Sequence, residues 1–318
     1  MNTSFEKIIC PSCSSKIDSE KFKESQNLTR KCECGFEYHL DSGCLKFLQK
    51  EHLSEKVLRT SNSFSQQWNF FDYEDEDFKT WDWNKTDRLK RFLIEIDETP
   101  SSLNGKKILD AGCGNGVLTN ALTLFGSNVV GSDISKSVIK ASSLRNSLAY
   151  NPDKVFFVQS DLNSLPFEKE TFDFIYSSGV LHHTPDTRNS FESVVKHLKK
   201  DGKIFIWLYR KTTLSMFVSE PLRKLTNKVE LWVSLGICKL LAYPFKFIRI
   251  ASRYMGIKTY PNKTIDELVI SLHDTLTPQY AYHYYEDEVL GWFSDLGFKK
   301  TKVTIRDSSG FGIIGTYG

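Results

Sequence analysis

One apolar stretch that ends in an acid and three closely spaced glycines constrains this chain more than any other feature. It runs from Ile108 to Gly116 and reads ILDAGCGNG, which predicts a buried strand followed by a glycine-rich turn. Glycines let the backbone turn tightly and let a ligand lie against its N–H groups. Residues 117–125 then read as a helix that begins over that ligand. The third glycine stands at 116 rather than 117, which argues against a dinucleotide fingerprint.

Further apolar strands follow, and polar residues stand where each one ends. The strand over 128–133 ends at Asp133, that over 155–162 contains Asp161, and that over 172–177 leads to Ser178. A fifth strand is expected over 203–208, after a helix over 191–198 and a turn at 201–202. Strands that alternate with helices from 106 to 209 predict a parallel sheet with helices on both faces. Ligands bind at the carboxyl ends of such strands, so we expect one pocket there.

This order of segments resembles the class I S-adenosylmethionine-dependent methyltransferases, in particular the ubiquinone-type domain. The resemblance covers residues 106–209 specifically and 286–318 loosely, and it implies a Rossmann-like α/β sheet of seven strands. It also implies that Asp133 binds the ribose and Asp161 the adenine, while the glycine turn supports the methionine part. The expected cofactor-binding residues of this region are Asp110, Gly112, Cys113, Gly114, Asn115, Gly116, Asp133, Ile134, Asp161, Leu162 and Ser178.

Residues 51–105 form an aromatic-rich connector and cap, with rings at Phe64, Trp68, Phe70, Phe71, Trp81 and Trp83. We expect most of these rings to pack against the sheet. Related methyltransferases carry a similar segment that closes over the methionine end of the cofactor, so Gln67 and Trp68 are expected in the pocket. A helix over 88–96 leads into the first strand.

Five of the seven cysteines fall within the first 44 residues, which points to a metal rather than to disulfides. Cys10, Cys13, Cys32 and Cys34 are the expected ligands of a structural zinc ion in a unit over residues 1–50. The second pair is one residue tighter than usual, which leaves His39 or Cys44 as substitutes. The segment also resembles the zinc-ribbon activator subunit of tRNA methyltransferases, and in that alignment Cys44 takes an apolar, buried position.

Histidines near the expected acceptor side are candidates for a general base. His182 and His183 follow the fourth strand, and His283 lies in an aromatic cluster over 280–285. An imidazole that titrates near neutral pH can remove a proton from an acceptor oxygen. The alternative is that these side chains only pack or shape the pocket.

The segment from 210 to about 285 is too long for a simple crossover. Its section 229–257 is apolar with Lys239, Lys246, Arg249 and Arg253 interspersed, and no uninterrupted apolar run reaches the ~18 residues of a membrane span. We therefore expect no transmembrane segment, and a helical lid over the substrate is preferred to a membrane-surface helix or a dimer surface. A helix over 286–296 and a hairpin of 299–306 with 311–317 complete the sheet.

The chain has 318 residues, a net charge of +3 and no signal-peptide pattern, so a cytoplasmic enzyme is expected. The expected reaction is methyl transfer from S-adenosylmethionine to a small molecule, at a hydroxyl of a glycan, lipid-linked or secondary metabolite. RNA modification is one alternative, although the sequence lacks the Lys/Arg stripe that tracks phosphates. A zinc-bearing scaffold that has lost activity is the other.

Overall fold

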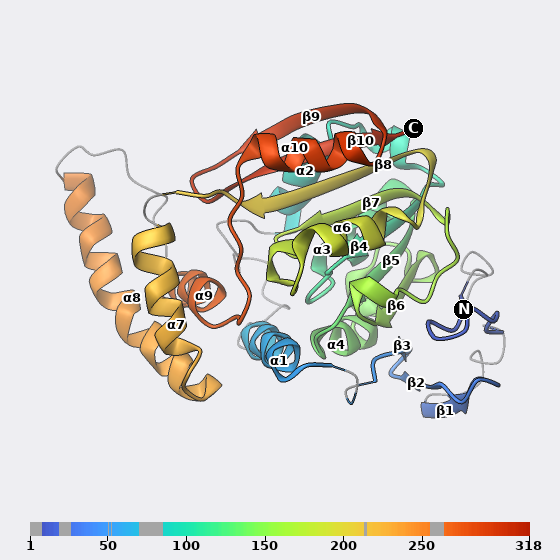
Figure 1. Ribbon diagram of the computed structural model, residues 1–318, viewed down its shortest axis with the longest axis horizontal. Coiled ribbons are helices and arrows are strands. Elements are labelled where there is room, and N and C mark those ends of the chain that lie inside the picture. The colour runs from blue at the N-terminus through green and yellow to red at the C-terminus, as the bar shows by residue number, and fades with distance from the viewer. Residues whose placement is uncertain are drawn as a thin grey trace.

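The computed structural model describes residues 8–18, 27–49, 51, 53–69, 85–212, 215–254 and 264–318 (Figure 1). Its centre is a mixed sheet of ten strands in the order β1-β2-β3-β6-β5-β4-β7-β8-β10-β9. The rings predicted to pack at Phe70, Phe71, Trp81 and Trp83 lie outside the described residues.

The strands fall into three groups by direction and by position in the chain. The N-terminal group is antiparallel and holds β1 (Asn27–Lys31), β2 (Glu37–Asp41) and β3 (Cys44–Lys46). The central group is parallel and holds β4 (Lys107–Ala111), β5 (Asn128–Asp133), β6 (Val155–Gln159), β7 (Phe172–Ser178) and β8 (Leu198–Tyr209). The hairpin of β9 (Phe298–Arg306) and β10 (Gly310–Tyr317) pairs with β8 through β10.

The Rossmann-like α/β class predicted from the sequence is confirmed. The seven expected strands are those that follow β3 in the order of the sheet, β6-β5-β4-β7-β8-β10-β9. The total of seven is wrong, because the sheet has ten strands. The three extra strands belong to the cysteine-rich segment, where β3 pairs in parallel with β6 and brings Cys44 beside Phe157. The segment predicted as a separate zinc ribbon therefore extends the central sheet, and the proposed boundaries at 50 and 105 stay predictions.

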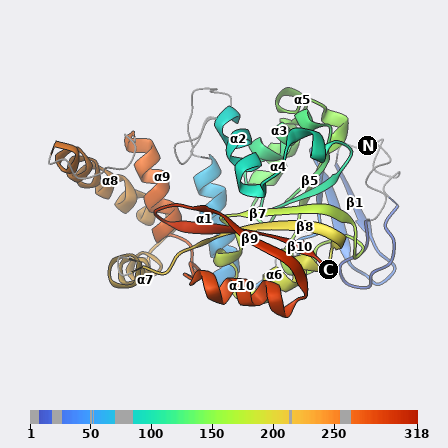
Figure 2. The ribbon, with the colours of Figure 1, turned by 90° about the horizontal axis from the view of Figure 1, so that it is seen from above.

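Helices cover both faces of the sheet, as the alternation of strands and helices predicted (Figure 2). One face packs against α6 (Thr187–Val195) and α10 (Glu286–Asp295). The other packs against α2 (Lys85–Ile96), α3 (Val117–Ala121) and α4 (Ser137–Ser143). Successive strand residues contribute to opposite faces, as Ile108 and Leu109 do in β4, so the central strands are buried on both sides. Short elements complete this region: η4 (Pro100–Leu103), η5 (Leu122–Phe125), α5 (Arg145–Leu148), η6 (Pro152–Lys154), η7 (Leu162–Ser164) and η8 (Leu181–His183).

The fifth central strand begins earlier than the sequence predicted. A turn was expected at Asp201 and Gly202, but β8 runs from Leu198 through this point. The pairing with β7 is shifted here, from Phe172 opposite Leu198 to Phe174 opposite Lys203. Asp201 has a φ of +59°, so the turn signal marks an irregularity inside the strand rather than a break before it.

The insertion after β8 is helical, and its helices lie at the opposite end of the molecule from the N-terminal strands (Figures 1 and 2). It contains η9 (Ser215–Ser219), α7 (Glu220–Thr226), α8 (Leu231–Tyr254) and α9 (Ile265–Leu276). α1 (Glu55–Asn69) contacts α9, and Ser63 Oγ lies 2.6 Å from Thr277 Oγ1.

The expectation of no transmembrane segment stays a prediction. Within α8, Leu231–Ser252 is long and apolar enough to cross a bilayer, although one such helix is weak evidence of a span. The sequence argument rested on uninterrupted apolar runs, whereas this helix is apolar as a whole despite its interspersed basic residues.

Candidate functional site

A cavity of about 640 Å³ lies at the carboxyl ends of the central strands. Its wall includes Asp110 of β4, Asp133 at the end of β5, Asp161 just after β6 and Ser178 at the end of β7. β4 lies between β5 and β7, where the order of the strands reverses, and ligands of open parallel sheets bind at such a point. Cavities of this size accommodate cofactors and drug-sized molecules.

The glycine turn after β4 forms one side of the cavity and leaves no space for side chains. Gly112 and Gly114 have φ values of +88° and +54°. An added Cβ would lie 2.3 Å from Val180 at Gly112 and 2.7 Å from the Trp68 ring at Gly114. The Gly112 N–H donates to the Ser132 carbonyl at 2.7 Å, which attaches the turn to β5. Glycine is therefore required both by the backbone conformation and by close neighbours.

Asp110 is a buried acid beneath this turn. Its Oδ2 accepts a 2.6 Å hydrogen bond from Thr119 Oγ1. Burial raises the pKa of Asp110 to about 6, and the hydrogen bond from Thr119 only partly offsets this effect. Such a perturbed carboxyl in a cavity is typical of a functional site rather than of a surface acid.

The other two strand-end acids are held in place by backbone groups. Asp133 accepts from Gly114 N–H at 2.8 Å and from Ser135 N–H at 2.7 Å, one on each carboxylate oxygen. Burial raises the pKa of Asp133 despite these bonds. Asp161 Oδ1 accepts from Asn163 N–H at 2.9 Å. A carboxylate has about four acceptor positions, so each acid keeps capacity for a ligand hydroxyl or amine.

The two residues predicted from the connector lie on different sides of α1. Trp68 lines the cavity and its ring packs over Gly114, as the resemblance implied for one of the pair. Gln67 is buried and points toward α9, where its Oε1 lies 3.3 Å from His273 Nδ1. Gln67 therefore joins α1 to α9 and is not among the described residues of the cavity wall.

Two adjacent histidines, His182 and His183, border the cavity from η8. His183 Nδ1 lies 2.7 Å from the Tyr280 carbonyl oxygen, which can only accept, so Nδ1 carries the proton. Its Nε2 has no hydrogen-bond partner among the described groups. Burial lowers the pKa of His183, which keeps the ring neutral with an available lone pair on Nε2.

The other two predicted histidines are placed differently. His182 is fully buried, with its ring centroid 4.0 Å from that of Tyr209, and neither ring nitrogen is hydrogen-bonded within the part of the chain that the structure describes. Burial lowers its pKa well below the ordinary value. His283 lies outside the described cavity wall, where its ring stacks on Tyr209 at 5.4 Å, and burial lowers its pKa to about 4.

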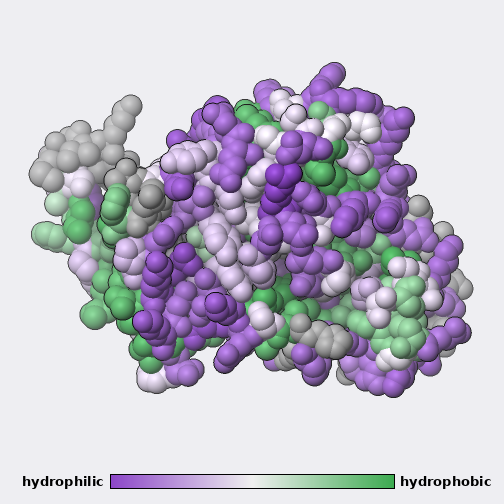
Figure 3. All heavy atoms as spheres, viewed as in Figure 1, coloured by the Kyte–Doolittle hydropathy of each residue, from purple (hydrophilic) through white to green (hydrophobic). Residues whose placement is uncertain are grey.

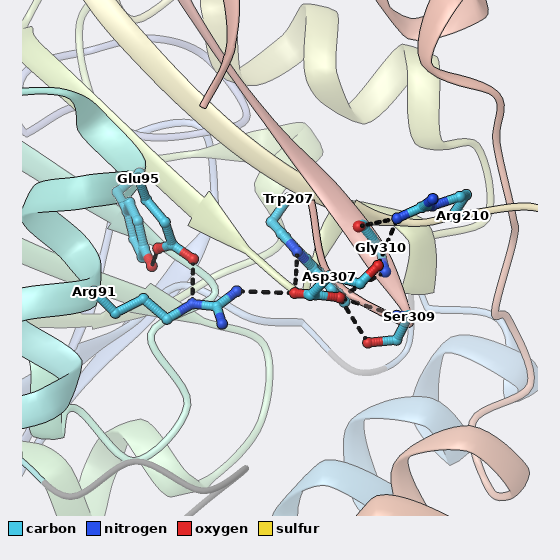
Figure 4. Close-up of polar contacts among 8 residues, drawn as sticks. Arg91, Glu95, Trp207, Arg210, Asp307, Ser309 and Gly310 are labelled. Carbon is cyan, nitrogen blue, oxygen red and sulfur yellow. Dashed lines mark hydrogen bonds and ion pairs between the residues drawn. The ribbon is translucent and has the colours of Figure 1, made fainter. Parts of the chain in front are cut away.

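A polar network forms a wall that the sequence analysis did not foresee (Figure 4). Arg91 Nε donates to Glu95 at 2.6 Å and its Nη2 donates to Asp307 at 3.1 Å. Trp207 Nε1 also donates to Asp307, at 3.2 Å, and Tyr176 donates to Glu95 at 2.6 Å. Burial alone would raise the pKa of Asp307, but the Ser309 N–H, Arg91 and neighbouring donors lower it. This wall is therefore ordered by hydrogen bonds that converge on the two carboxylates.

The helical insertion contributes another part of the cavity wall, and its role as a lid stays a prediction. Arg249 of α8 and Ser271, Asp274 and Thr275 of α9 line the cavity. Asp274 accepts a short hydrogen bond from the Tyr209 hydroxyl, which joins α9 to the end of β8. Burial and the Asp274 carboxylate together raise the pKa of Tyr209 well above its ordinary value, so this phenol stays protonated.

Most of the predicted site residues come together in this cavity. Those on its wall are Trp68, Asp110, Gly112, Cys113, Gly114, Asn115, Asp133, Ile134, Asp161, Leu162, Ser178, His182 and His183. Gly116 is outside the described wall because its Cα faces Ala141 and Phe157, where it allows α4 to approach the sheet closely. Gly179 and Val180 next to Ser178 were missed although they lie beside a predicted residue.

The four predicted zinc ligands form a second cluster, within the N-terminal part of the chain. The sulfur atoms of Cys10, Cys13, Cys32 and Cys34 all lie within 4.8 Å of one another. Two of the separations, Cys10 to Cys34 and Cys13 to Cys32, are 3.6 Å. Tetrahedral zinc with Zn–S bonds of about 2.3 Å requires sulfurs about 3.8 Å apart, so the cluster fits such an ion.

The substitutes for the second cysteine pair lie elsewhere. His39 Nδ1 is 2.9 Å from Thr29 Oγ1, and Cys44 is fully buried in the core, as predicted for an apolar position. Neither residue belongs to the cysteine cluster found in the described chain. The tighter spacing of Cys32 and Cys34 therefore does not prevent their sulfurs from converging with those of Cys10 and Cys13.

Comparison with known proteins shows that part of this chain is similar in sequence to methyltransferases. A profile of the methyltransferase domain matches residues 109–206. The ubiquinone biosynthesis O-methyltransferase of Coxiella burnetii (strain RSA 331 / Henzerling II) is 25% identical over 164 residues, which are 50% of this chain and 63% of that protein. The mitochondrial enzyme of the same name from Bos taurus is 34% identical over 135 residues, 41% of this chain and 35% of that protein. The match thus spans less than two thirds of the length of these curated relatives.

Two of the solved structures that match are both described as containing a methyltransferase. Magnesium protoporphyrin IX methyltransferase from Synechocystis PCC 6803 with bound SAH has 18% identity and a TM-score of 0.49, and the match covers 83% of this chain and all of that one. The complex of the Haloferax volcanii Trm112 methyltransferase activator with a methyltransferase has 12% identity and a TM-score of 0.46, over 81% of this chain and 96% of that one.

Proposed function

We propose that this chain, which carries a class I S-adenosylmethionine-dependent methyltransferase domain, transfers the methyl group of S-adenosylmethionine to a small molecule. The observation that carries the proposal is a single cavity bordered by one glycine turn and three strand-end acids, Asp110, Asp133 and Asp161. In this assignment the turn supports the methionine part, Asp133 binds the ribose hydroxyls and Asp161 binds the adenine amine.

The bound cofactor would supply an electrophilic methyl group, and the protein would supply alignment and proton removal. We assign proton removal to His183, because its Nδ1 is anchored on the Tyr280 carbonyl and its Nε2 lone pair remains available. His182 is assigned to the wall, where it packs between Tyr209 and Trp207. A hydroxyl of a glycan, lipid-linked or secondary metabolite is the acceptor that such a base suits.

The test compares two neighbouring substitutions, His183→Gln and His182→Gln. Radiolabelled S-adenosylmethionine is incubated with one fractionated small-molecule extract and each protein, and label transfer is measured. Loss of a general base is expected to slow transfer by roughly a hundredfold or more at position 183. Titration calorimetry should show unchanged cofactor affinity. The substitution at position 182 is expected to have a much smaller effect.

Each outcome has a separate meaning. Full turnover by the His183→Gln protein would reject the base and leave the methyltransferase proposal intact. Absence of S-adenosylmethionine binding by the unmodified protein would reject the enzyme and favour a scaffold. Steeply salt-dependent binding of tRNA would instead favour RNA modification.

We also propose that the four-cysteine cluster holds a structural zinc ion. All four positions are occupied by sulfur, so the cluster leaves no coordination position open for a reacting water. No disulfide joins any of the seven cysteines, which suits the reducing cytoplasm that we propose as the location.

A further inference from the structure

The exposed side of α8 carries an apolar stripe that the proposed function does not use. Large side chains recur along it at steps of three and four residues after Leu240, so they share one face of the helix. These residues are 42–88% exposed. The apolar stripe consists of Trp232, Leu240, Tyr243, Phe247, Ile250 and Tyr254.

The opposite side of α8 is buried against α9. Ser234, Cys238 and Ala242 are buried at steps of four residues, and the latter two pack against Leu268 and Val269. The helix is therefore attached to the protein along one side and presents the apolar stripe on the other. Figure 3 shows hydrophobic residues gathered at the left of the molecule, over α8.

The charges of α8 all have one sign. No Asp or Glu occurs from 231 to 254, while Lys239 and Lys246 lie on the helix face next to the apolar stripe. Basic side chains beside an apolar face are typical of helices that lie in the surface of an anionic bilayer. Trp232, Tyr243 and Tyr254 add rings with one polar end, which prefer the boundary between lipid and water.

We propose that α8 binds the surface of a membrane that contains anionic lipids, with its axis in the membrane plane and the apolar stripe inserted among the headgroups. This orientation keeps the packing of α8 on α9, whereas a spanning helix would have to expose the α9 residues Leu268 and Val269. Arg249 of the same helix lines the cavity, so the membrane-facing element is also part of the site wall. The inference concerns binding alone and holds whether or not methyl transfer occurs.

The test is sedimentation of the full chain with vesicles of phosphatidylcholine alone or mixed with phosphatidylglycerol. The unmodified protein is expected to bind the mixed vesicles and to bind the neutral ones weakly. The combined change Trp232→Gln, Leu240→Gln and Phe247→Gln should lower binding by ~100-fold or more, because three side chains no longer leave water. Lys239→Gln with Lys246→Gln should remove most of the preference for phosphatidylglycerol, roughly thirtyfold.

A matched control changes exposed apolar side chains elsewhere: Ile94→Gln, Leu124→Gln and Tyr150→Gln, which are 62%, 51% and 56% exposed. This variant should bind vesicles as the unmodified protein does. Brominated lipids should also quench the fluorescence of the unmodified protein and should quench less after Trp232→Phe, which tests the surface without a multiple variant.

Four results would overturn the proposal. The first is no binding of the unmodified protein to either vesicle, and the second is equal loss in the control variant. The third is a dimer in solution that becomes monomeric when the apolar stripe is changed, which would assign this face to a second copy. Retention in membranes after alkaline carbonate extraction would also contradict it, because it would indicate a spanning helix.

Discussion

Replacing Asp110 with Asn should stabilise the protein without its cofactor, and the gain should depend on pH. Burial raises the pKa of Asp110 to about 6 from an ordinary value of 3.8. The unfolded chain releases this proton more readily than the folded protein does. As the pH rises from 3.8 to about 6, Asp110 therefore lowers the free energy of unfolding progressively, and above pH 6 the loss stays constant. The difference in pKa corresponds to ~3 kcal/mol at pH 7.

Asparagine removes this cost and keeps the local contact. Its side-chain oxygen can accept the hydrogen bond that Thr119 now donates at 2.6 Å. Urea unfolding of both proteins should show the Asn variant more stable by ~3 kcal/mol at pH 7 and by ~1 kcal/mol at pH 4.5. Exposed Asp153, changed to Asn, is the control and should show no comparable pH-dependent gain.

The slope with pH is the decisive quantity, because a packing change in the variant would shift stability equally at both pH values. If the difference in unfolding free energy between the two proteins stays constant from pH 4.5 to 7, burial does not raise the pKa of Asp110 and the reasoning is refuted. A gain that appears as calculated would mean that the chain keeps a destabilising acid in its cavity, as functional sites commonly do.

Two further predictions concern the cavity and the cysteine cluster. Gly114→Ala should weaken S-adenosylmethionine binding at least ~10-fold, as measured by calorimetry. A residue with a Cβ costs about 1–2 kcal/mol at a φ of +54°, and this Cβ would lie 2.7 Å from the Trp68 ring. Unchanged affinity would exclude the turn from the binding site. Purified protein should contain one zinc ion by elemental analysis, and Cys34→Ala or a chelator should lower the unfolding temperature by several degrees. A metal-free preparation with unaltered stability would contradict the structural role.

The part of the site that follows strand ends could be predicted from the sequence. Asp110, Asp133 and Asp161 stand at strand ends because the apolar runs before them are long enough to define each strand, and parallel strands bring such ends together. The same local logic located the cysteine cluster, whose ligands recur in two short motifs.

The opposite wall could not be predicted, because its contacts join distant parts of the chain. Arg91 and Asp307 are 216 residues apart in the sequence, and no local motif around either residue predicts their contact. Gln67 was placed in the pocket by resemblance and His283 by its place in an aromatic cluster. The direction of each side chain depends instead on the packing of α9 against Gln67 and of Tyr209 against His283. Their roles stay predictions.

The number of strands was underestimated for a related reason. A short run such as Cys44 to Lys46 has too few residues to show a period, and its partner in β6 begins more than a hundred residues later. Likewise, the Asp201-Gly202 pair reads as a turn in the sequence, but it marks a residue with positive φ inside a continuous strand.

The pairing of β3 with β6 has a consequence for solubility. Without it, β6 would present a row of unpaired backbone donors and acceptors on a strand of Val and Phe residues, a template for aggregation between copies. The outermost strand is instead β1, which carries Arg30 and Lys31 and is a poor template for such growth. If the cysteine cluster holds a structural zinc ion, as proposed above, a cell short of zinc is expected to accumulate the protein as insoluble material.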